Sequence, residues 1–467
     1  MSSPTSEAQV LTGAQMRAAE AALFDAGTSD SVLMERAGAG AADWVRRIAA
    51  GRAVSVLVGP GNNGGDGYVI ARHLREAGNS VRLIAPLPPA SKSATAARDA
   101  WDGPTMTSGD ASEADVLVDC MFGTGLSRPL SPEHALLLRD LAERHKLRIA
   151  IDLPSGIATD SGAALNEKLP HYDVTLALGA WKLAHWSLPG RDIMGAKRLI
   201  PLGIGAVEGA ARLIGTPQLR APASDAHKYT RGLAAIIGGE MPGAAVLAAE
   251  AAQRAGAGYV KLVSDQSHPA AGADLVIEKG PAAEALDDER IAAVLVGPGL
   301  GRGGAAKDAL GAAMKAGRPL VLDADALTLL APNVLNRDIP ILATPHDGEL
   351  ETLCRSFRVV ASGRRDRAAA LARATGMVVL AKGPDSVVAA PDGRVALARP
   401  ASSWLSTAGT GDVLAGIAVS RLAVGRDPFT AAGEALWLHG EAARLLGPAF
   451  TAAALACNVD RAFARAM

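Results

Sequence analysis

The sequence predicts an α/β protein built from two domains. Its 467 residues are enough for two or three domains, and 49% of them are apolar, so each half can bury a core of its own. Short Val- and Ile-rich runs alternate with helical patterns in both halves, which is typical of parallel sheets covered by helices. Glycine and proline interrupt this alternation at residues 214–224, and we expect a linker there.

The first half opens with a helical pattern over residues 12–50, in which apolar side chains recur at helical spacing. Residues 54–58 are a continuous apolar run that predicts a buried strand, and a glycine-rich loop follows it. Residues 68–76 predict a helix that ends at Gly78, and residues 81–84 predict the next strand. This order indicates a parallel pair of strands joined by a right-handed crossover.

Three further strands are predicted in the first half, at residues 116–118, 148–151 and 174–177. The first two run directly into polar loops, at residues 119–125 and 152–156. Ligands of open α/β sheets bind beyond the carboxyl ends of the strands. We therefore expect these two loops and the glycine-rich loop to meet at one crevice.

The second half restarts the alternation with a strand, a helix and a strand. These elements are predicted at residues 233–237, 243–254 and 259–263. Further strands are predicted at 293–296, 320–322, 341–343 and 378–381, and a further helix at 413–421. The two halves share no motif and no short period repeats, so they are not simple duplicates of each other.

Composition excludes several kinds of partner. The net charge is −1 and 3% of the residues are aromatic, so we expect neither a basic field for nucleic acid nor stacking platforms for single strands. Cys120, Cys354 and Cys457 fit no disulfide framework or zinc spacing. Residues 1–13 lack the apolar core of a secretory signal, and apolar segments are too short to cross a bilayer. We expect a cytoplasmic protein.

The glycine-rich loop of the first half runs from Gly59 to Gly67 with the sequence GPGNNGGDG. Between a strand and a helix, its backbone N–H groups can face a phosphate, and its glycines allow close approach. Asparagine amides can hydrogen-bond a pyrophosphate, and the side-chain oxygen of Asn63 suits a hard cation. A tight turn with Asp66 as the helix N-cap explains the same residues without a ligand, and the pattern alone leaves both interpretations open.

Residues 60–74 resemble the corresponding motif of the NAD(P)H-hydrate epimerase family. The segments 119–126, 151–156, 179–182 and 189–192 resemble the later motifs of that family in the same order, so the resemblance spans about residues 12–210. It implies a hydrated nicotinamide cofactor held by Asn62, Asn63, Gly64, Gly65 and Asp66 together with Gly123, Thr124, Gly125, Leu126, Ser127 and Arg128. It also implies a potassium ion held by Asn63, Asp119 and Ser155.

The chemistry implied for this site needs a proton carrier. Inverting C6 of a hydrated nicotinamide breaks and remakes a bond at a carbinolamine carbon, and a positioned carboxylate can shuttle the proton. The resemblance places Asp152 against the substrate, so Asp152 is the candidate catalytic residue, with Lys182 as the weaker candidate. Loop capping at the strand ends is the alternative role for Asp119 and Asp152.

A second glycine-rich loop, TAGTGD, covers residues 407–412 and precedes an apolar helix. Glycine amides at a helix N-terminus can hold the negative charge of a transferring phosphoryl group, and an aspartate there can deprotonate an attacking hydroxyl. An ordinary N-cap after a glycine turn is the alternative interpretation of Asp412.

This second loop resembles that of the ribokinase-like superfamily, where such an aspartate is the catalytic base. The more specific resemblance is to ADP- or ATP-dependent NAD(P)H-hydrate dehydratases, over about residues 224–465. Its motifs occur in order at residues 228–232, 238–245, 255–258, 297–301, 323–327, 344–349 and 382–383. The resemblance implies a pocket for the hydrated nicotinamide formed by Ala244, Gly299, His346 and Asp412, and a nucleotide site formed by Lys382, Gly383, Pro384, Asp385, Ser386 and Gly411.

The same resemblance implies that Asp412 deprotonates the C6 hydroxyl, which attacks the terminal phosphate of the nucleotide; phosphate then leaves. The segment 401–406 departs from the family pattern because it lacks the expected Asn and Gly residues and contains the bulky Trp404. Nucleotide contacts from this segment are therefore not expected. Arg231 stands near a place where small residues are usual.

Together, the motifs predict a Rossmann-like three-layer αβα epimerase domain over residues 1–216 and a ribokinase-like αβα dehydratase domain over residues 222–467. The predicted function is repair of hydrated NADH and NADPH, with a potassium ion in the epimerase site and ADP, with or without Mg²⁺, as co-substrate. A vitamin-type kinase with a non-catalytic nucleotide-binding first domain is the alternative. We expect small-molecule substrates, no nucleic-acid or membrane partner, and a homo-oligomer. The sequence leaves ADP versus ATP open.

Overall fold

The computed structural model describes residues 8–108, 114–266 and 268–467. Contacts divide the chain into two compact units, Met1–Arg212 and Leu213–Met467. Residues 1–7, which belong to the segment expected to lack a secretory signal, lie outside the described residues. Residues 214–223 have no regular secondary structure, while the domain limits at 216 and 222 stay predictions. No helix within the described ranges is long and apolar enough to span a membrane.

The amino-terminal unit contains a parallel sheet. In spatial order its strands are β4 (Thr105–Met106), β3 (Val81–Ile84), β2 (Val54–Val58), β5 (Val116–Cys120), β6 (Leu147–Ile151), β7 (Val174–Leu178) and β9 (Ala196–Ile200). The chain proceeds outward from β2 to β4 on one side and from β5 to β9 on the other. This reversal makes the ends of β2 and β5 the switch point of the sheet, where α/β proteins bind ligands.

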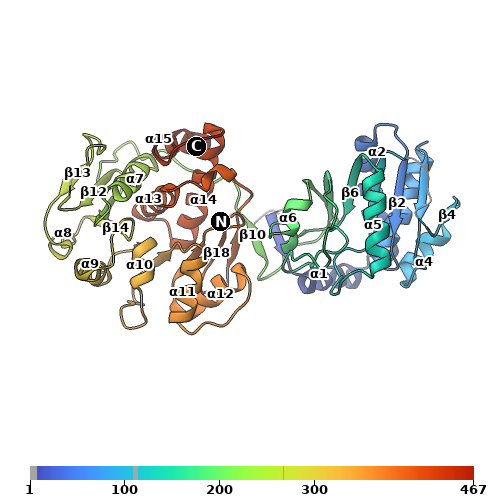
Figure 1. The fold of residues 1–467 in the computed structure, drawn as a ribbon, viewed down its shortest axis with the longest axis horizontal. Helices are drawn as coiled ribbons and strands as arrows, with labels where there is room; N and C mark the ends of the chain where they lie inside the picture. Colours follow the sequence, from blue (N-terminus) through green and yellow to red (C-terminus); the bar gives the residue numbers. More distant parts are fainter. Residues whose placement is uncertain (1–7, 109–113, 267) are drawn as a thin grey trace. The chain divides into compact units, whose positions relative to one another are not determined.

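Helices cover both faces of this sheet. The main ones are α1 (Gly13–Asp25), α2 (Asp30–Ala49), α3 (Asn62–Glu76), α4 (Lys92–Asp99) and α5 (Pro132–Arg144), with the short α6 (Gly190–Ile193) near the end of the unit. Val56 packs with residues of α2 and α3, whereas its neighbour Leu57 packs with α5, because successive strand side chains point to opposite faces. The result is the predicted three-layer αβα arrangement (Figure 1).

Three short strands pair with one another near the limits of the amino-terminal unit. Strand β1 (Gln9–Leu11) runs parallel to β8 (Trp181–Lys182) and antiparallel to residues 211–212 of β10 (Ala211–Leu213). The pairing brings Leu11 opposite Lys182, and both side chains are buried. A buried lysine requires a charged or polar partner, which in this case lies in the candidate site.

The carboxy-terminal unit contains a second, larger sheet. In spatial order its strands are β13 (Val276–Glu278), β12 (Tyr259–Val263), β11 (Leu233–Ile237), β14 (Ile291–Val296), β15 (Leu320–Leu322), β16 (Ile341–Ala343), β17 (Val378–Ala381), β18 (Val387–Ala389) and β19 (Val395–Leu397). The pairs from β13 to β17 are parallel and the last two pairs are antiparallel.

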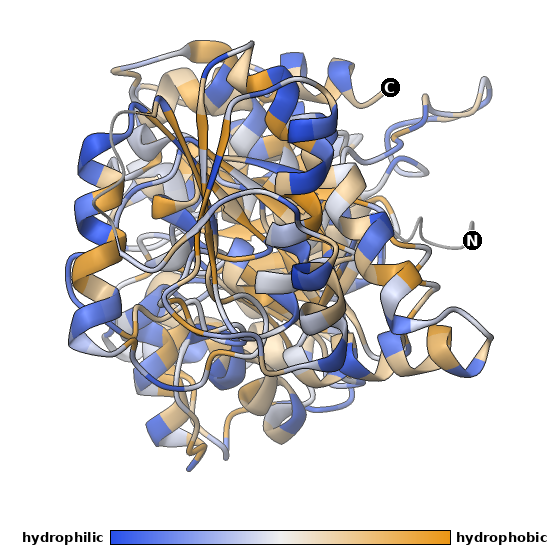
Figure 2. Ribbon diagram, turned by 90° about the vertical axis from the view of Figure 1, so that its right-hand side faces the viewer, coloured by the Kyte–Doolittle hydropathy of each residue, from blue (hydrophilic) through white to orange (hydrophobic). Residues whose placement is uncertain are grey.

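Two helical layers enclose this second sheet. One face packs against α7 (Pro242–Arg254), α13 (Thr410–Ala423), α14 (Pro428–Leu446), α15 (Ala452–Cys457) and α16 (Val459–Arg465). The other packs against α8 (Ala282–Ala285), α9 (Gly304–Lys315), α10 (Ala324–Leu329), α11 (Asp347–Ser356) and α12 (Arg364–Thr375). Strands are mostly orange in the hydropathy colouring of Figure 2, whereas the surrounding helices mix orange and blue. The two-domain α/β prediction is thus confirmed.

Several element boundaries differ from the sequence prediction. The helical pattern predicted over 12–50 is confirmed, and it consists of two helices, α1 and α2, separated at residues 26–29. The expected loop 62–67 is helical, because α3 begins at Asn62 with Gly61 as its N-cap. The alternative role of Asp66 as N-cap is therefore wrong.

The second glycine-rich loop is also helical in part, because its helix begins earlier than the sequence predicted. Helix α13 begins at Thr410 with Gly409 as N-cap in the left-handed conformation, φ +88°. Asp412 therefore lies within the first helical turn, and its alternative role as N-cap is also wrong.

Candidate active sites in the two units

A cavity of about 640 Å³ opens at the switch point of the amino-terminal sheet. Most of the predicted substrate-binding residues line it: Asn62, Asn63, Asp66, Gly123, Thr124, Gly125, Leu126, Ser127, Arg128 and Asp152. Lys182 also lines the cavity. Three segments far apart in sequence therefore meet at one site. This confirms the expectation that the loops at the carboxyl ends of these strands converge on one crevice.

Gly64 and Gly65 have a different place from the one predicted. A Cβ at Gly64 would overlap the carbonyl oxygen of Gly59, and one at Gly65 would overlap the side chain of Met34. Neither glycine is among the residues that line the cavity. The absent side chain of Gly64 allows α3 to approach the end of the strand that precedes it, which sets the position of Asn63, and that of Gly65 allows α3 to pack closely against α2 and α4.

The predicted cation ligands form a buried group beneath the cavity. Asp119 accepts hydrogen bonds from the Ser155 hydroxyl at 2.7 Å, the Ser155 amide at 3.0 Å and the Tyr172 hydroxyl at 2.6 Å. The side-chain amide of Asn63 is buried with no hydrogen-bond partner for its oxygen or its nitrogen. A buried amide without partners is costly unless a ligand satisfies it, so this group has the orphaned oxygen that a cation site requires.

Asp152 and Lys182 form a buried ion pair at the wall of the cavity. The Lys182 ammonium lies 2.5 Å from Asp152 Oδ1, and the side chains are 1% and 8% exposed. Thr124 donates to Asp152 Oδ2 from its amide at 2.8 Å and from its hydroxyl at 2.6 Å. Burial raises the pKa of Asp152, but Lys182 and these hydrogen bonds outweigh it and leave the pKa below its ordinary value.

The backbone at Asp152 is also unusual. Its φ is +63°, a left-handed conformation that non-glycine residues seldom adopt and that costs of order 1–3 kcal/mol. The carbonyl of Asp152 accepts a hydrogen bond from His185 Nε2 at 2.8 Å, which helps hold this conformation. Strain of this kind is typical of positions where a side chain must be aimed at a ligand.

Two other acids in the cavity have raised pKa values, whereas the pKa of Asp152 is lowered. Burial, together with the charges of Asp152 and Glu20, holds the pKa of Asp66 well above its ordinary range. Burial likewise raises the pKa of Glu20, which lines the cavity from α1. A carboxyl group of lowered pKa next to carboxyl groups of raised pKa is the arrangement that separates a proton acceptor from a proton donor. None of the quoted motifs contains Glu20, Tyr172 or His185, so these residues were not predicted.

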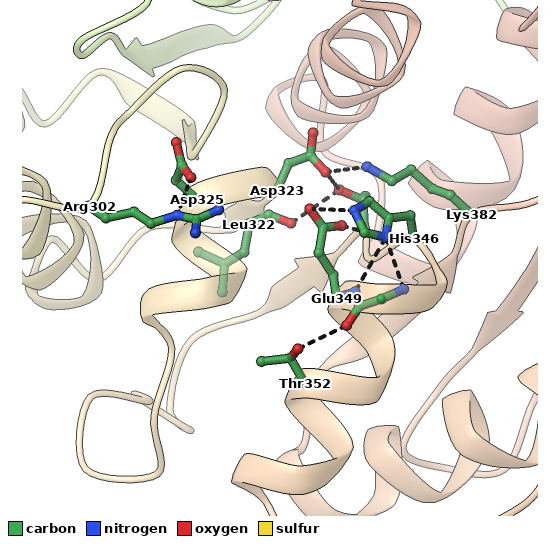
Figure 3. A network of polar contacts seen from close by, with 10 residues as sticks. Arg302, Leu322, Asp323, Asp325, His346, Glu349, Thr352 and Lys382 are labelled. Carbon is green, nitrogen blue, oxygen red and sulfur yellow. Dashed lines mark hydrogen bonds and ion pairs between the residues drawn. The ribbon is translucent and has the colours of Figure 1, made fainter. Parts of the chain in front are cut away.

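The carboxy-terminal unit contains a second polar cluster beyond the ends of β15, β16 and β17 (Figure 3). Lys382 follows β17, and its ammonium lies 2.5 Å from Oδ1 of Asp323, which follows β15. The Thr344 hydroxyl donates to the same oxygen at 2.8 Å. A Cβ added to Gly411 would lie 3.5 Å from the Lys382 nitrogen, so the lysine reaches the N-terminus of α13. Asp323 was quoted within a motif but not predicted as a site residue.

Asp412 lies in the first turn of α13 and faces this charge cluster. Burial and then the charge of Asp323 raise the pKa of Asp412 to about 7, although Lys382 opposes the shift. For Lys382, burial lowers the pKa, but the charges of Asp323 and Glu349 outweigh it and the pKa is raised. A carboxylate with a pKa near neutrality is well matched to act as a general base at physiological pH.

The other predicted residues lie around this cluster. His346 is the N-cap of α11, where its Nδ1 accepts the amide of Gly348 at 3.0 Å, and its side chain is 62% exposed. The added Cβ of Gly299 would lie 3.1 Å from the Cβ of Ala244, so these two residues are adjacent.

The predicted nucleotide segment forms a tight turn after β17. The Ser386 hydroxyl donates to the Gly383 carbonyl at 2.7 Å and accepts the Gly383 amide at 3.0 Å. Arg364 pairs with Asp385 and covers Gly383. Arg364 was not predicted, because it lies on α12, outside every motif. Pro384 completes the turn.

Comparison with known proteins agrees with this two-site arrangement. Residues 30–184 match the family described as YjeF-related protein N-terminus, and residues 234–465 match the family described as NAD(P)H-hydrate dehydratase. The chain is 35% identical to the bifunctional NAD(P)H-hydrate repair enzyme Nnr of Gloeobacter violaceus, over 94% of this chain and 93% of that protein. It is 35% identical to the enzyme of the same name from Salinibacter ruber, over 94% and 92% respectively.

Among solved structures, the ADP/ATP-dependent NAD(P)H-hydrate dehydratase of Bacillus subtilis, co-crystallised with ATP and Mg²⁺, is 28% identical. The match covers 54% of this chain and 95% of that chain, with a TM-score of 0.47. The matches to the full-length relatives cover both units. The chain belongs to the family of bifunctional NAD(P)H-hydrate repair enzymes.

Proposed function

We propose that the amino-terminal cavity interconverts the R and S hydrates of NADH and NADPH, and that the carboxy-terminal cluster dehydrates the S hydrate at the expense of ADP. The observation that supports this most is the presence of two separate constellations, one in each unit. The first places Asp152, whose pKa is lowered, beside Asp66, whose pKa is raised well above its ordinary range, and the second places a base of pKa about 7 at a helix N-terminus. The limits 1–216 and 222–467 are proposed for the corresponding domains.

In the epimerase site, Asp152 is the proposed proton acceptor. Lys182 and Thr124 keep it ionised and fixed in direction, so that it can take the proton of the C6 hydroxyl or of an attacking water. Asn62 and the segment Gly123–Arg128 would hold the dinucleotide at the cavity mouth through amide and backbone groups. Asp66 would remain protonated beside the substrate.

Asn63, Asp119 and Ser155 are proposed to hold a potassium ion. Two observations fit: the Asn63 oxygen is buried without a partner, and the set is rich in oxygen and mostly neutral. The ion would add positive charge next to the phosphates of the substrate.

In the dehydratase site, Asp412 would take the proton of the C6 hydroxyl, and the resulting oxygen would attack the terminal phosphorus of MgADP. The bond between that phosphorus and the bridging oxygen breaks, and AMP leaves. Lys382 and the amides at the N-terminus of α13 would stabilise charge on the transferring group. Loss of the C6 phosphate together with the C5 proton then restores NAD(P)H.

Recovery of the reduced cofactor tests this proposal. The protein is incubated with a mixture of R and S hydrates and either ADP or ATP, while reduced-cofactor absorbance and the R-to-S ratio are followed. We expect full recovery from both isomers with ADP, and loss of recovery but intact epimerisation in Asp412→Asn. A stable phosphorylated product instead of NADH would indicate a small-molecule kinase, and a failure of both nucleotides would refute the dehydratase assignment.

A further inference from the structure

Helix α1 forms one wall of the amino-terminal cavity and contributes an acid to it. Met16, Glu20 and Phe24 all line the cavity. They lie four residues apart, so they share one face of the helix. Among the described residues, none forms a hydrogen bond or an ion pair with the Glu20 carboxyl group, which is therefore available to a ligand.

The pairing of β1 with β8 positions this wall relative to the catalytic ion pair. Leu11 lies opposite Lys182, and α1 begins at Gly13, two residues further along the chain. The Gly13 amide donates to Asp160 Oδ1 at 2.7 Å, which fixes the start of the helix. Glu20 follows about two helical turns later. One strand register thus sets the positions of both Lys182 and Glu20.

The charges around Glu20 place it in the same electrostatic cluster as Asp152. Burial raises the pKa of Glu20; next in order, the Lys182 charge opposes this rise and the Asp152 charge adds to it. Asp30 on α2 raises the pKa further, and Arg17 on α1 lowers it. Glu20 is thus the more weakly acidic partner of a carboxyl group whose own pKa is lowered.

The cavity has more acids than the binding of its substrate requires. A dinucleotide has a negatively charged pyrophosphate, which carboxylates repel. Carboxylates in a partly buried cavity instead stabilise positive charge that develops during a reaction. The charged side chains that line the cavity are four acids, Glu20, Asp30, Asp66 and Asp152, and three bases, Arg17, Arg128 and Lys182.

Cleavage of the bond between C6 and its hydroxyl oxygen would generate such a positive charge. When the protonated hydroxyl leaves as water, the lone pair of N1 forms a double bond to C6 and the ring becomes cationic. Addition of water to the other face then inverts C6. This route requires an acid for the leaving hydroxyl and a base for the incoming water.

We propose that Glu20 is a second catalytic residue of the amino-terminal site and protonates the C6 hydroxyl as it leaves. Asp152 accepts a proton from the water that adds to the opposite face, and the new bond between C6 and oxygen forms. Glu20 then regains a proton from solvent and Asp152 releases one, so atoms and charges balance. The reverse inversion follows the same path with the two roles exchanged. This inference rests on the proposed epimerase function and names its acid.

An oxygen label tests the route. The full chain is incubated with pure R hydrate in ¹⁸O-enriched water without nucleotide, and the mass of the S hydrate is measured at early times, after subtraction of the reaction without protein. Because the cavity is open to solvent, we expect one ¹⁸O atom in each inverted molecule. Inversion that retains the original oxygen would show that the ring opens between N1 and C6 instead, and would overturn the proposal.

Substitution at position 20 tests the residue. Glu20→Gln keeps the shape of the side chain but supplies no acidic proton, so the kcat of epimerisation should fall about a hundredfold to ten-thousandfold. The KM for the hydrate should change little. Glu20→Asp, which retains a carboxyl group, should be faster than Glu20→Gln. Asp25→Asn is the matched control, since it makes the same chemical change at an exposed residue of α1 that does not line the cavity.

The outcomes separate this inference from the function on which it rests. If the wild type does not interconvert the R and S hydrates, the epimerase function itself fails. If the wild type interconverts them but Glu20→Gln does so with unchanged kcat, the function stands and Glu20 is not its acid. A rise in KM with unchanged kcat would make Glu20 a binding residue and would also overturn the proposal. Dehydration of the S hydrate with ADP should be the same in all these variants.

Discussion

Replacing Asp412 by asparagine is expected to stabilise the carboxy-terminal unit at pH 8 while it abolishes NADH recovery. The pKa of Asp412 is about 7 in the folded state against an ordinary value of 3.8, because burial and Asp323 oppose its charge. A shift of about three units corresponds to about 4 kcal/mol, which partial exposure to solvent reduces to about 2–4 kcal/mol. Asparagine imitates the neutral form and removes this penalty.

The sign of the effect depends on pH. A raised pKa means that the folded state binds the proton more tightly than the unfolded state, so the stability that Asp412 contributes is fully present below pH 4 and is lost as the pH rises through about 7. Asp412→Asn should therefore match wild type near pH 4 and exceed it at pH 8. Amide hydrogen exchange of α13 reports the opening free energy of this unit by itself, which avoids assuming two-state unfolding of the whole chain.

Asp338→Asn is the matched control, since the same chemical change occurs there on an exposed loop residue with only local contacts. It should alter neither stability nor recovery. If Asp412→Asn is no more stable than wild type at pH 8, or if its advantage persists unchanged at pH 4, then Asp412 is not held near neutrality and the argument for it as the base fails. Stability gained at the cost of activity is the pattern expected of a catalytic position.

Three further outcomes are expected. NADH recovery should rise about tenfold between pH 6 and pH 8 as Asp412 ionises, while the lowered pKa of Asp152 keeps that residue ionised in epimerisation assays over the same range; a flat recovery profile would contradict the assignment. Lys182→Met should leave Asp152 as an unpaired buried charge, destabilise the amino-terminal unit by about 3–5 kcal/mol in urea unfolding and abolish epimerisation; normal stability would show that the ion pair is dispensable. Gly64→Ala should force α3 away from the carbonyl of Gly59 and impair epimerisation, measured from the R-to-S ratio, while leaving dehydration intact; unimpaired epimerisation would mean that the position of α3 is not critical.

Strands were predictable because their signal is local. The runs 54–58, 81–84, 233–237 and 259–263 are short, apolar and rich in β-branched residues, and the structure has β2, β3, β11 and β12 with those same limits. Short strands such as β1 and β8 were missed, because their pairing joins residues about 170 positions apart and no local pattern marks it.

The first residues of helices were less predictable than the strands, because tertiary packing decides where these helices begin. Gly64, Gly65 and Gly67 have low intrinsic helix propensity, so the segment 62–67 suggested a loop. In the structure these glycines lie where a Cβ would overlap neighbouring atoms, so the close approach of α3 to the sheet requires Gly64 and Gly67, and its close approach to α2 and α4 requires Gly65. The helix therefore tolerates poor local propensity because tertiary contacts outweigh it.

Only those site residues that belong to the quoted motifs could be predicted from the sequence. Resemblance identified Asp152 and Asp412, but it could not show that Lys182 is the ion-pair partner of Asp152 or that Asp323 raises the pKa of Asp412. Such partners are set by which strands are neighbours in the sheet: Asp323 and Lys382 follow β15 and β17, which flank β16.

The burial of α13 has a consequence for redesigning this enzyme. Nearly every residue from Val413 to Ala423 is buried, and a Cβ at Gly416 would overlap the carbonyl of Ala248 on α7. Close packing therefore fixes the position of the helix that carries Asp412, and this helix cannot tilt to accommodate a substrate of different shape. A mutant library aimed at a new phosphoryl donor should leave this helix untouched and vary the side chains of α14 that line a neighbouring cavity, such as Leu436, Trp437 and Arg444, because these can change without displacing the carboxylate of Asp412.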